Sequence, residues 1–140
     1  MSPTSQEEIE DMREIPYQNA VGSLMYANTE TRPDITCSEP ASQFAINPGR
    51  QHWIAVKRIL RYQKYTSSIK LGFTKSEDSS LKVFCDADWG SDEDDRRSYT
   101  GYLFILADAA VSWVSRKQPT VALSTTEVEY MALTETAKEA

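Results

Sequence analysis

The stretch "FCDADWGSDEDDRRS", residues Phe84–Ser98, decides how the second half of this chain folds. An apolar and aromatic segment typical of a β-strand runs into six carboxylates within ten positions and then into two arginines. Carboxylates crowded in this way repel one another, so either water or a bound cation has to stabilise them. The pattern predicts a strand that ends in acids, and it raises the question of what those acids hold.

The residues around this strand predict a small, mainly antiparallel sheet. In "LKVFCDADW" one face carries Leu81, Val83, Cys85 and Ala87, and the other carries Phe84, Asp86 and Asp88. Other strands are expected in "IKLGFT" (69–74), "TGYLFILADA" (100–109) and "AVSWVSRKQ" (110–118), with turns at "KSEDSS" and near 107–109. Helical spacing then runs from Ser124 to Ala140. The fold class is α/β (mixed α+β): an antiparallel sheet of three to four strands with a C-terminal helix packed on it.

The first half of the chain has helical spacing. Residues 1–14 are acidic and poor in large apolar groups, which is typical of a solvated leader or linker. From Tyr17 onwards, Val21, Leu24 and Met25 line one helical face. After it, Thr31 is expected to cap a short or broken helix with Pro33 in its first turn, and Pro40 to interrupt that helix.

The most regular helix is predicted in "QHWIAVKRILRYQKY", directly after the turn "NPGR". Its apolar side carries Trp53, Val56, Ile59 and Leu60, and its basic side carries Arg50, Lys57, Arg58, Arg61 and Lys64. Two interpretations of the basic side stay open. It is either the solvated face of an amphipathic helix or a stripe that follows nucleic-acid phosphates.

Composition limits the classes of function. The chain has 140 residues, a formal charge of −6 and a pI near 4.8, so it has no overall basic field for a polyanion. Its two cysteines do not make a disulfide framework, and Cys85 is expected to be a buried, reduced thiol, which favours an intracellular (cytoplasmic or nuclear) location. We expect neither a signal peptide nor a membrane-spanning segment.

Common metal and nucleophile motifs do not fit. A helix-loop-helix calcium loop starting at Asp86 would have Gly90 at its third ligand and Ser91 at its obligatory glycine. Zinc lacks ligands, because His52 is the single histidine and the two cysteines are far apart in sequence. His52 is expected to be a packing or surface residue, and no Ser or Cys nucleophile accompanies it.

The last helix separates two acids by role. Ser124 and Glu127 have the spacing of a capping box, which gives Glu127 a structural role. Glu129 falls on or beside the apolar side that should face the sheet, where a carboxylate is costly unless it is paired or binds a cation. Asp86 ends a strand of that sheet, and two converging carboxylates suit a hard cation such as magnesium. The alternative is that Glu129 is a boundary residue whose carboxylate reaches water.

A series of motifs resembles one family. In order, they are "PYQNAVGSLMYANTETRPDI", "HWIAVKRILRY", "DADWGSDEDDRRSYTGYLF", "VSWVSRKQPTVALSTTEVEYMAL" and "KEA". They resemble the polymerase-to-ribonuclease H segment of copia-type retrotransposon Pol polyproteins. The resemblance implies a leader at 1–14, a helical connection after the reverse transcriptase at 15–68, and the first half of a ribonuclease H-like domain at 69–140.

The resemblance also implies roles. Asp86 and Glu129 match two of the four acids that hold two Mg²⁺ (or Mn²⁺) ions in the family's RNA–DNA hybrid endonuclease, and the other two acids are expected beyond Ala140. The loop acids Asp92, Glu93, Asp94 and Asp95 are expected, with Arg96 and Arg97, to form a solvated connection. The sequence departs from the family at "ITCSEPASQF", which is more polar, and at "LADAAVSW", which lacks the usual glycine pair.

Three hypotheses follow. The first is a Pol fragment whose intact parent cuts the RNA strand of RNA–DNA hybrids by two-metal catalysis, with little activity in this chain alone and with the reverse transcriptase portion of Pol as its partner. The second is a non-enzymatic module that binds nucleic acid or a polymerase through residues 50–64. The third is a relict fragment without a selected role, which predicts a poorly cooperative fold.

Overall fold

The computed structural model describes residues 5–75, 80–92 and 94–140, and for Glu39 it describes the backbone alone. Parts of the expected leader, of the "KSEDSS" turn and of the acidic loop lie outside these residues, namely 1–4, 76–79 and Glu93. The chain forms two compact units, residues 1–70 and 71–140, which we describe separately. Within the described residues no helix is long and apolar enough to cross a membrane.

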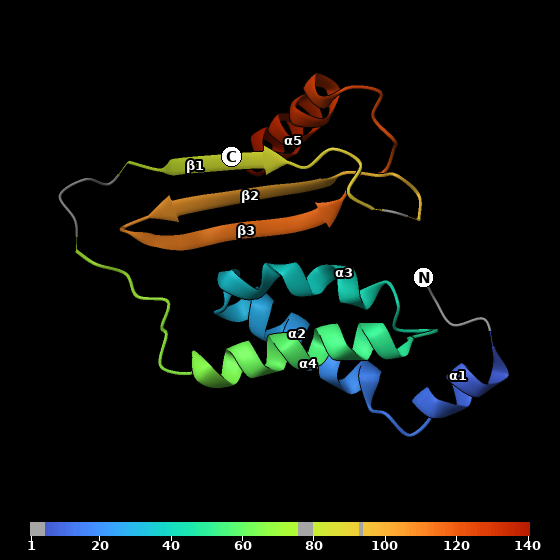
Figure 1. Cartoon of the computed structure of the whole chain (residues 1–140). Helices are drawn as coiled ribbons and strands as arrows, with labels where there is room; N and C mark the ends of the chain where they lie inside the picture. The colour runs from blue at the N-terminus through green and yellow to red at the C-terminus, as the bar shows by residue number, and fades with distance from the viewer. Residues whose placement is uncertain (1–4, 76–79, 93) are drawn as a thin grey trace. The chain divides into compact units, whose positions relative to one another are not determined.

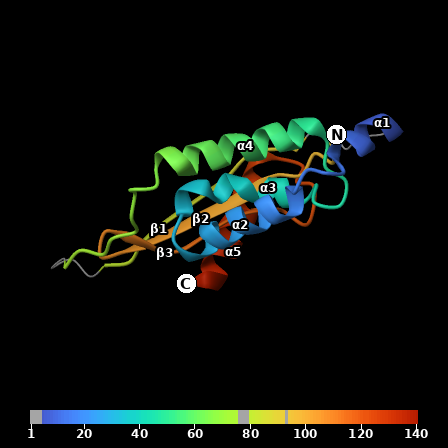
Figure 2. The same ribbon diagram turned by 90° about the horizontal axis from the view of Figure 1, so that it is seen from below.

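The first unit is helical (Figures 1 and 2). Its elements are α1 (Gln6–Met12), α2 (Tyr17–Glu30), a 3-10 segment η1 (Pro33–Ser38), α3 (Glu39–Ser42) and α4 (Arg50–Tyr65). Helix α1 lies near the start of α4, where Asp11 and Arg50 form an ion pair with an O–N distance of 2.5 Å. Residues 6–12 of the expected leader are thus a helix, because Ser5 caps it and Met12 is buried in the core.

The core of this unit lies between α2 and α4. Its buried residues are Met12, Tyr17, Val21, Leu24, Ile35 and Val56. The Tyr17 hydroxyl donates a hydrogen bond to the Ala41 carbonyl at 2.9 Å, which satisfies the polar end of a buried ring. The expected face of α2 is correct except at Met25, which is 37% exposed.

The segment after α2 is short and broken, as the prolines predicted. Pro33 begins η1, and Pro40 lies in the first turn of α3, where a missing N–H costs little. The predicted capping role of Thr31 is wrong, because this residue ends α2 and its N–H donates to the Ala27 carbonyl.

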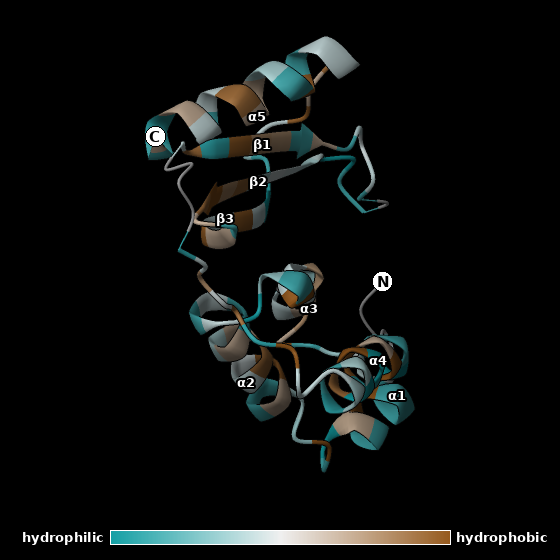
Figure 3. Ribbon diagram, turned by 90° about the vertical axis from the view of Figure 1, so that its left-hand side faces the viewer, coloured by the Kyte–Doolittle hydropathy of each residue, from teal (hydrophilic) through white to brown (hydrophobic). Residues whose placement is uncertain are grey.

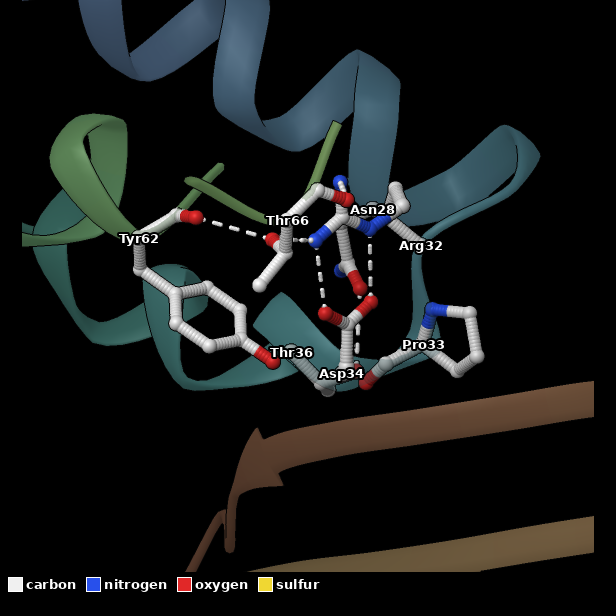
Figure 4. A network of polar contacts seen from close by, with 7 residues as sticks. All are labelled: Asn28, Arg32, Pro33, Asp34, Thr36, Tyr62 and Thr66. Carbon is white, nitrogen blue, oxygen red and sulfur yellow. Dashed lines mark hydrogen bonds and ion pairs between the residues drawn. The ribbon is translucent and has the colours of Figure 1, made fainter. Parts of the chain in front are cut away.

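Arg32 connects the end of α2 to the end of α4 (Figure 4). Its guanidinium donates to both carboxylate oxygens of Asp34 at 2.8 and 2.7 Å and to the Thr66 hydroxyl at 2.6 Å. Arg32 is 9% exposed, so the planar ion pair that it makes with Asp34 is shielded from water. The hydrogen bond from Arg32 holds the pKa of Asp34 below its ordinary value.

The second unit is a three-stranded antiparallel sheet with one helix. Its strands are β1 (Lys82–Ala87), β2 (Tyr99–Leu106) and β3 (Ala109–Lys117), in the order β1-β2-β3. Helix α5 (Thr125–Glu139) packs with β1 and β2 and buries Val128, Ala132 and Thr136. The mixed α/β class and the antiparallel sheet are confirmed. The register pairs Asp86 with Gly101 and Cys85 with Tyr102.

Two expectations for this unit are wrong. Residues 69–74 form no strand, and Ile69 and Phe73 are exposed because no apolar layer covers them. Cys85 is exposed rather than buried, because β1 is the edge strand of the sheet as described and α5 leaves it largely uncovered. Cys37 is also an exposed free thiol.

The hairpin between β2 and β3 turns through two residues with left-handed backbones. Ala107 and Asp108 have φ values of 52° and 62°, which a type I′ turn requires and which Asn-Gly supplies most easily. Thr74 supports the turn, since its N–H donates to the Ala107 carbonyl at 3.0 Å and its hydroxyl to Asp108 at 2.6 Å. The alanine therefore carries a steric cost that glycine would not.

We expect Ala107→Gly to stabilise the second unit by about 1 kcal/mol, because it removes the left-handed strain of a Cβ. The control is Ala137→Gly on the exposed side of α5, which should destabilise the same unit by about 1 kcal/mol. Urea unfolding of both variants measures the difference. A loss of stability in Ala107→Gly would show that the turn is not strained.

We expect Asp34→Asn to destabilise the first unit by about 2 kcal/mol at neutral pH, because Arg32 loses its carboxylate partner. The ionised Asp34 carboxylate contributes to the free energy of unfolding above its ordinary pKa. This contribution is lost as the pH falls through the lowered pKa of the folded state. The wild type should therefore lose more stability than the variant below about pH 4. Asp11→Asn is the matched control, because its ion pair with Arg50 is solvent-exposed and should contribute under about 1 kcal/mol. Urea unfolding with hydrogen exchange in α2 and α4 tests this, and equal losses in both variants would contradict it.

Candidate functional site

A hollow of about 440 Å³ lies between β1 and α5 and brings together the two predicted acids. Its lining residues are Cys85, Asp86, Thr126, Glu129, Tyr130, Ala132 and Leu133. Asp86 is contributed by the end of β1 and Glu129 by the early part of α5. The hollow is therefore formed by the two elements that the sequence analysis expected to converge.

Asp86 reaches this hollow because α5 lies alongside the edge strand (Figures 1 and 3). Cys85 points to the face of β1 that α5 covers, because it shares that face with Thr100, whose hydroxyl Gln118 connects to α5. Asp86 leaves the strand on the opposite face and borders the hollow at the open edge of β1. The Asp86 carboxylate accepts a hydrogen bond from the Ala87 N–H at 2.9 Å, which fixes one oxygen. Asp86 is solvent-exposed, so its other oxygen is accessible to a ligand.

Glu127 has the capping role that its spacing predicted, whereas Glu129 is an exposed residue at the boundary of the helix. The Ser124 hydroxyl accepts from the Glu127 N–H at 3.2 Å, and the Glu127 carboxylate accepts from the Leu123 N–H at 2.7 Å, so Glu127 caps α5. Glu129 is exposed at the boundary of the helix and lines the hollow with Asp86. It does not point into the apolar layer, because that layer is filled by Val128 and Ala132.

Carboxylates are the ligands that a hard cation prefers, and two of them line this hollow. Magnesium is commonly bound through one or two carboxylates, with water and phosphate oxygens completing the octahedron. Among the described residues no group of three or more His, Cys, Asp or Glu side chains gathers. Asp86 and Glu129 would thus hold one side of an ion, and oxygens from elsewhere would have to supply the rest.

Asp88 has a structural role. Its carboxylate accepts from the Tyr99 N–H at 2.6 Å, and its own N–H donates to the Tyr99 carbonyl at 3.2 Å. These bonds extend the pairing of β1 with β2 by one residue pair. They do not place Asp88 in the hollow, which Asp86 lines alone from the acidic end of β1.

The loop acids are not simply solvated, which corrects the expectation for Asp92 and Asp95. Lys117 at the end of β3 forms ion pairs with Asp92 at 2.6 Å and Asp95 at 3.0 Å, and the Asp92 side chain is only 13% exposed. The hydrogen bond from Lys117 lowers the pKa of Asp92. Burial acts to lower the pKa of Lys117, but the hydrogen bonds to both aspartates outweigh it and raise that pKa. The left-handed backbone at Arg96 and Gly90 bends this loop.

Gln118, which the sequence analysis did not single out, fixes α5 against the sheet. Its amide nitrogen donates to the Thr100 hydroxyl at 2.9 Å and to the Val128 carbonyl at 3.1 Å, and the residue is 3% exposed. Val128 directly precedes Glu129, so this contact determines where Glu129 lies. In the sequence, Gln118 is recognisable only as a polar residue between the end of a strand and a proline. That position does not indicate which groups its amide contacts.

The basic residues of α4 differ in their surroundings. Arg50 is paired with Asp11, and Lys57 lies 6.0 Å above the ring of Trp53. Arg58, Arg61 and Lys64 are exposed, and within the described residues no carboxylate forms an ion pair with them. Tyr62 and Tyr65 are exposed on the same helix. The helix therefore presents cations and aromatic rings to solvent.

Comparison with known proteins identifies the family. The chain is 53% identical over 140 residues to a retrovirus-related Pol polyprotein from transposon TNT 1-94 of Nicotiana tabacum, and it is 41% identical over 124 residues to that from transposon RE1 of Arabidopsis thaliana. It is also 49% identical over 130 residues to the secreted RxLR effector protein 161 of Plasmopara viticola. The chain belongs to this retrovirus-related Pol family.

The extent of the matches differs between relatives. The matched residues make up 99% of this chain but 10% of the tobacco polyprotein, and 88% of this chain but 8% of the RE1 polyprotein. They make up 92% of this chain and 92% of the Plasmopara protein. No family model matches the chain. No solved structure matches it either. This chain is thus a retrotransposon Pol fragment.

Proposed function

We propose that this Pol fragment joins the end of the reverse transcriptase portion to the first half of a ribonuclease H-like domain. The hollow that Asp86 and Glu129 share is the observation that supports this most directly. A strand acid and a helix acid at one point suit an endonuclease that positions a phosphodiester with metal ions. The helical unit, residues 1–70, would then be the connection, and the sheet unit the half domain.

In the intact parent, Asp86 and Glu129 would bind Mg²⁺ or Mn²⁺, which supplies an activated water and stabilises the leaving oxygen of the RNA strand. The protein's own contribution is to hold the two carboxylates in position. The Ala87 N–H orients Asp86, and the bond from Gln118 to Val128 orients the start of α5 and hence Glu129. The substrate in this proposal is an RNA–DNA hybrid, and the partner is the reverse transcriptase portion of Pol.

This chain by itself should bind the ions weakly. Two carboxylates supply fewer oxygens than the four-acid set that the resemblance implies, so water would have to fill most positions of the coordination sphere. We therefore propose little or no nuclease activity for the chain alone. The two exposed free thiols fit a reducing, intracellular location, cytoplasmic or nuclear.

Terbium(III), a hard cation whose emission tyrosine sensitises, tests the metal site because Tyr130 lines the same hollow. We expect Asp86→Asn and Glu129→Gln each to weaken terbium binding by roughly tenfold or more, and Mg²⁺ to compete with the terbium. Asp94→Asn is the control, because it removes an exposed acid that does not line the hollow. If all three variants bound terbium as the wild type does, the proposed metal site would be wrong.

A labelled RNA–DNA hybrid, incubated with Mg²⁺ or Mn²⁺, tests the proposed activity separately. The wild type and Asp86→Asn should both leave the hybrid intact. Robust cutting that Asp86→Asn abolishes would show that two acids suffice and would overturn the proposed dependence on further ligands.

A second function is favoured by the exposed cations of α4. Arg58, Arg61 and Lys64 face solvent beside Tyr62 and Tyr65, and a chain of net charge −6 concentrates this positive charge on one helix. Cations with interspersed aromatic rings suit binding of single-stranded or hybrid nucleic acid. In this proposal the fragment is a binding module, and α4 contacts phosphates or an acidic polymerase surface.

We expect reversal of Lys57, Arg58 and Arg61 to glutamate to weaken nucleic-acid binding at least tenfold and to flatten its salt dependence, because phosphate contacts release counterions. The control reverses Lys70, Lys75 and Lys138, which changes the net charge equally outside α4. Fluorescence anisotropy over a salt series measures both. Equal losses in the two triple variants would assign the effect to net charge and would contradict a site on α4.

A further inference from the structure

Strand β1 is exposed to an unusual extent for a strand rich in apolar residues. Every residue from Lys82 to Asp86 is exposed, including Val83 at 42% and Phe84 at 59%. In the portion of the chain that the structure describes, β1 pairs with β2 on one side and with no strand on the other. Open apolar edges of this kind readily pair with another strand, and charges or coverage usually protect them.

The hydrogen bonding of β1 shows which groups face outward. The bond from the Asp88 N–H to the Tyr99 carbonyl marks a hydrogen-bonded pair, so Asp86, Phe84 and Lys82 also direct their backbone groups towards β2. Val83, Cys85 and Ala87 then direct theirs to the open side. The Ala87 N–H is already bonded to the Asp86 carboxylate, which leaves Val83 and Cys85 available to a new strand.

The sequence of β1, KVFCDA, is complementary to itself in one antiparallel register. When two copies are centred on Phe84, Val83 of one copy lies opposite Cys85 of the other, so the outward backbone groups meet in hydrogen-bonded pairs. Lys82 of one copy then lies opposite Asp86 of the other, and the two Phe84 rings are adjacent. Opposite charges and aromatic pairs across strands stabilise such pairing.

We propose that two copies of this chain pair through β1 in this register and form a six-stranded sheet across a two-fold axis. A two-fold interface is self-complementary, so the contact between Lys82 and Asp86 occurs twice. The axis is perpendicular to the sheet and places both α5 helices on the same side. There, Tyr130 and Leu133, which are 71% and 53% exposed and line the hollow beside β1, add apolar surface to the contact.

The neighbouring register is less favourable for two reasons. Centring the pair on Cys85 places Phe84 opposite Asp86 and requires backbone bonds from Ala87, whose N–H is bonded to the Asp86 carboxylate. Lys82 of one copy then lies opposite Asp88 of the other rather than Asp86, and the Asp88 carboxylate already accepts a hydrogen bond from the Tyr99 N–H. The proposal is independent of the metal site, and we measure pairing in a chelator so that Asp86 holds no cation.

Charge-reversed variants of the full chain test this pairing by analytical ultracentrifugation in reductant and chelator. Wild type should form a dimer, whereas Lys82→Glu alone and Asp86→Lys alone should each weaken dimerisation by roughly tenfold or more, since both exchange two attractions for two repulsions. An equimolar mixture of the two variants should regain the dimer. In the mixed pair the introduced glutamate faces the introduced lysine, and the unchanged Asp86 of one variant faces the unchanged Lys82 of the other. Circular dichroism of each variant shows whether it is folded.

Recovery in the mixture distinguishes the proposed register from a general loss of folding, because a misfolded variant would not be rescued by its complement. A wild type that stays monomeric up to its solubility limit would overturn the proposal and leave the edge to a strand from another protein. Dimers that form equally well in each single variant, or a mixture that stays monomeric while both variants are folded, would also overturn it.

Discussion

The amide of Gln118 is the contact on which the candidate site depends. It joins the end of β3 to β2 through Thr100 and to the first turns of α5 through the Val128 carbonyl. All three residues are buried, so water does not compete for these bonds. Because Glu129 directly follows Val128, the rotation of α5 that this amide imposes also places Glu129 at the hollow beside β1. Asp86 and Glu129 therefore line one hollow as a consequence of buried hydrogen bonds in which neither takes part.

The described carboxylates differ in their partners. Asp34, Asp92 and Asp95 have arginine or lysine partners, and for Asp34 and Asp92 these partners lower the carboxyl pKa. Such acids are committed to the fold, since removing the partner would leave a partly buried charge. Asp86 and Glu129 line an open hollow, and within the described residues neither forms an ion pair. We propose that a cation from solvent binds these two carboxylates rather than the paired ones.

The site and the uncovered strand are parts of one feature. Asp86 is accessible because β1 is at the edge of the described sheet, and the same position exposes Val83, Phe84 and Cys85. A further strand at this edge would bury apolar surface and would bring new side chains close to Asp86 and Glu129. The position of β1 at the edge of the described sheet therefore accounts both for the open side of the hollow and for the exposed apolar residues of the strand.

The sequence by itself determined the local features of this protein. Apolar periodicity predicted α2, α4 and α5, alternation predicted β1, and the spacing of Ser124 and Glu127 predicted the cap of α5, because these depend on residues a few positions apart. Only the tertiary structure decided that residues 69–74 form no strand, that Cys85 is exposed, that Asp92 and Asp95 pair with Lys117, and that Gln118 positions Glu129. Each of these depends on which segments, distant in sequence, cover or contact one another, and a local pattern of residues does not contain that information.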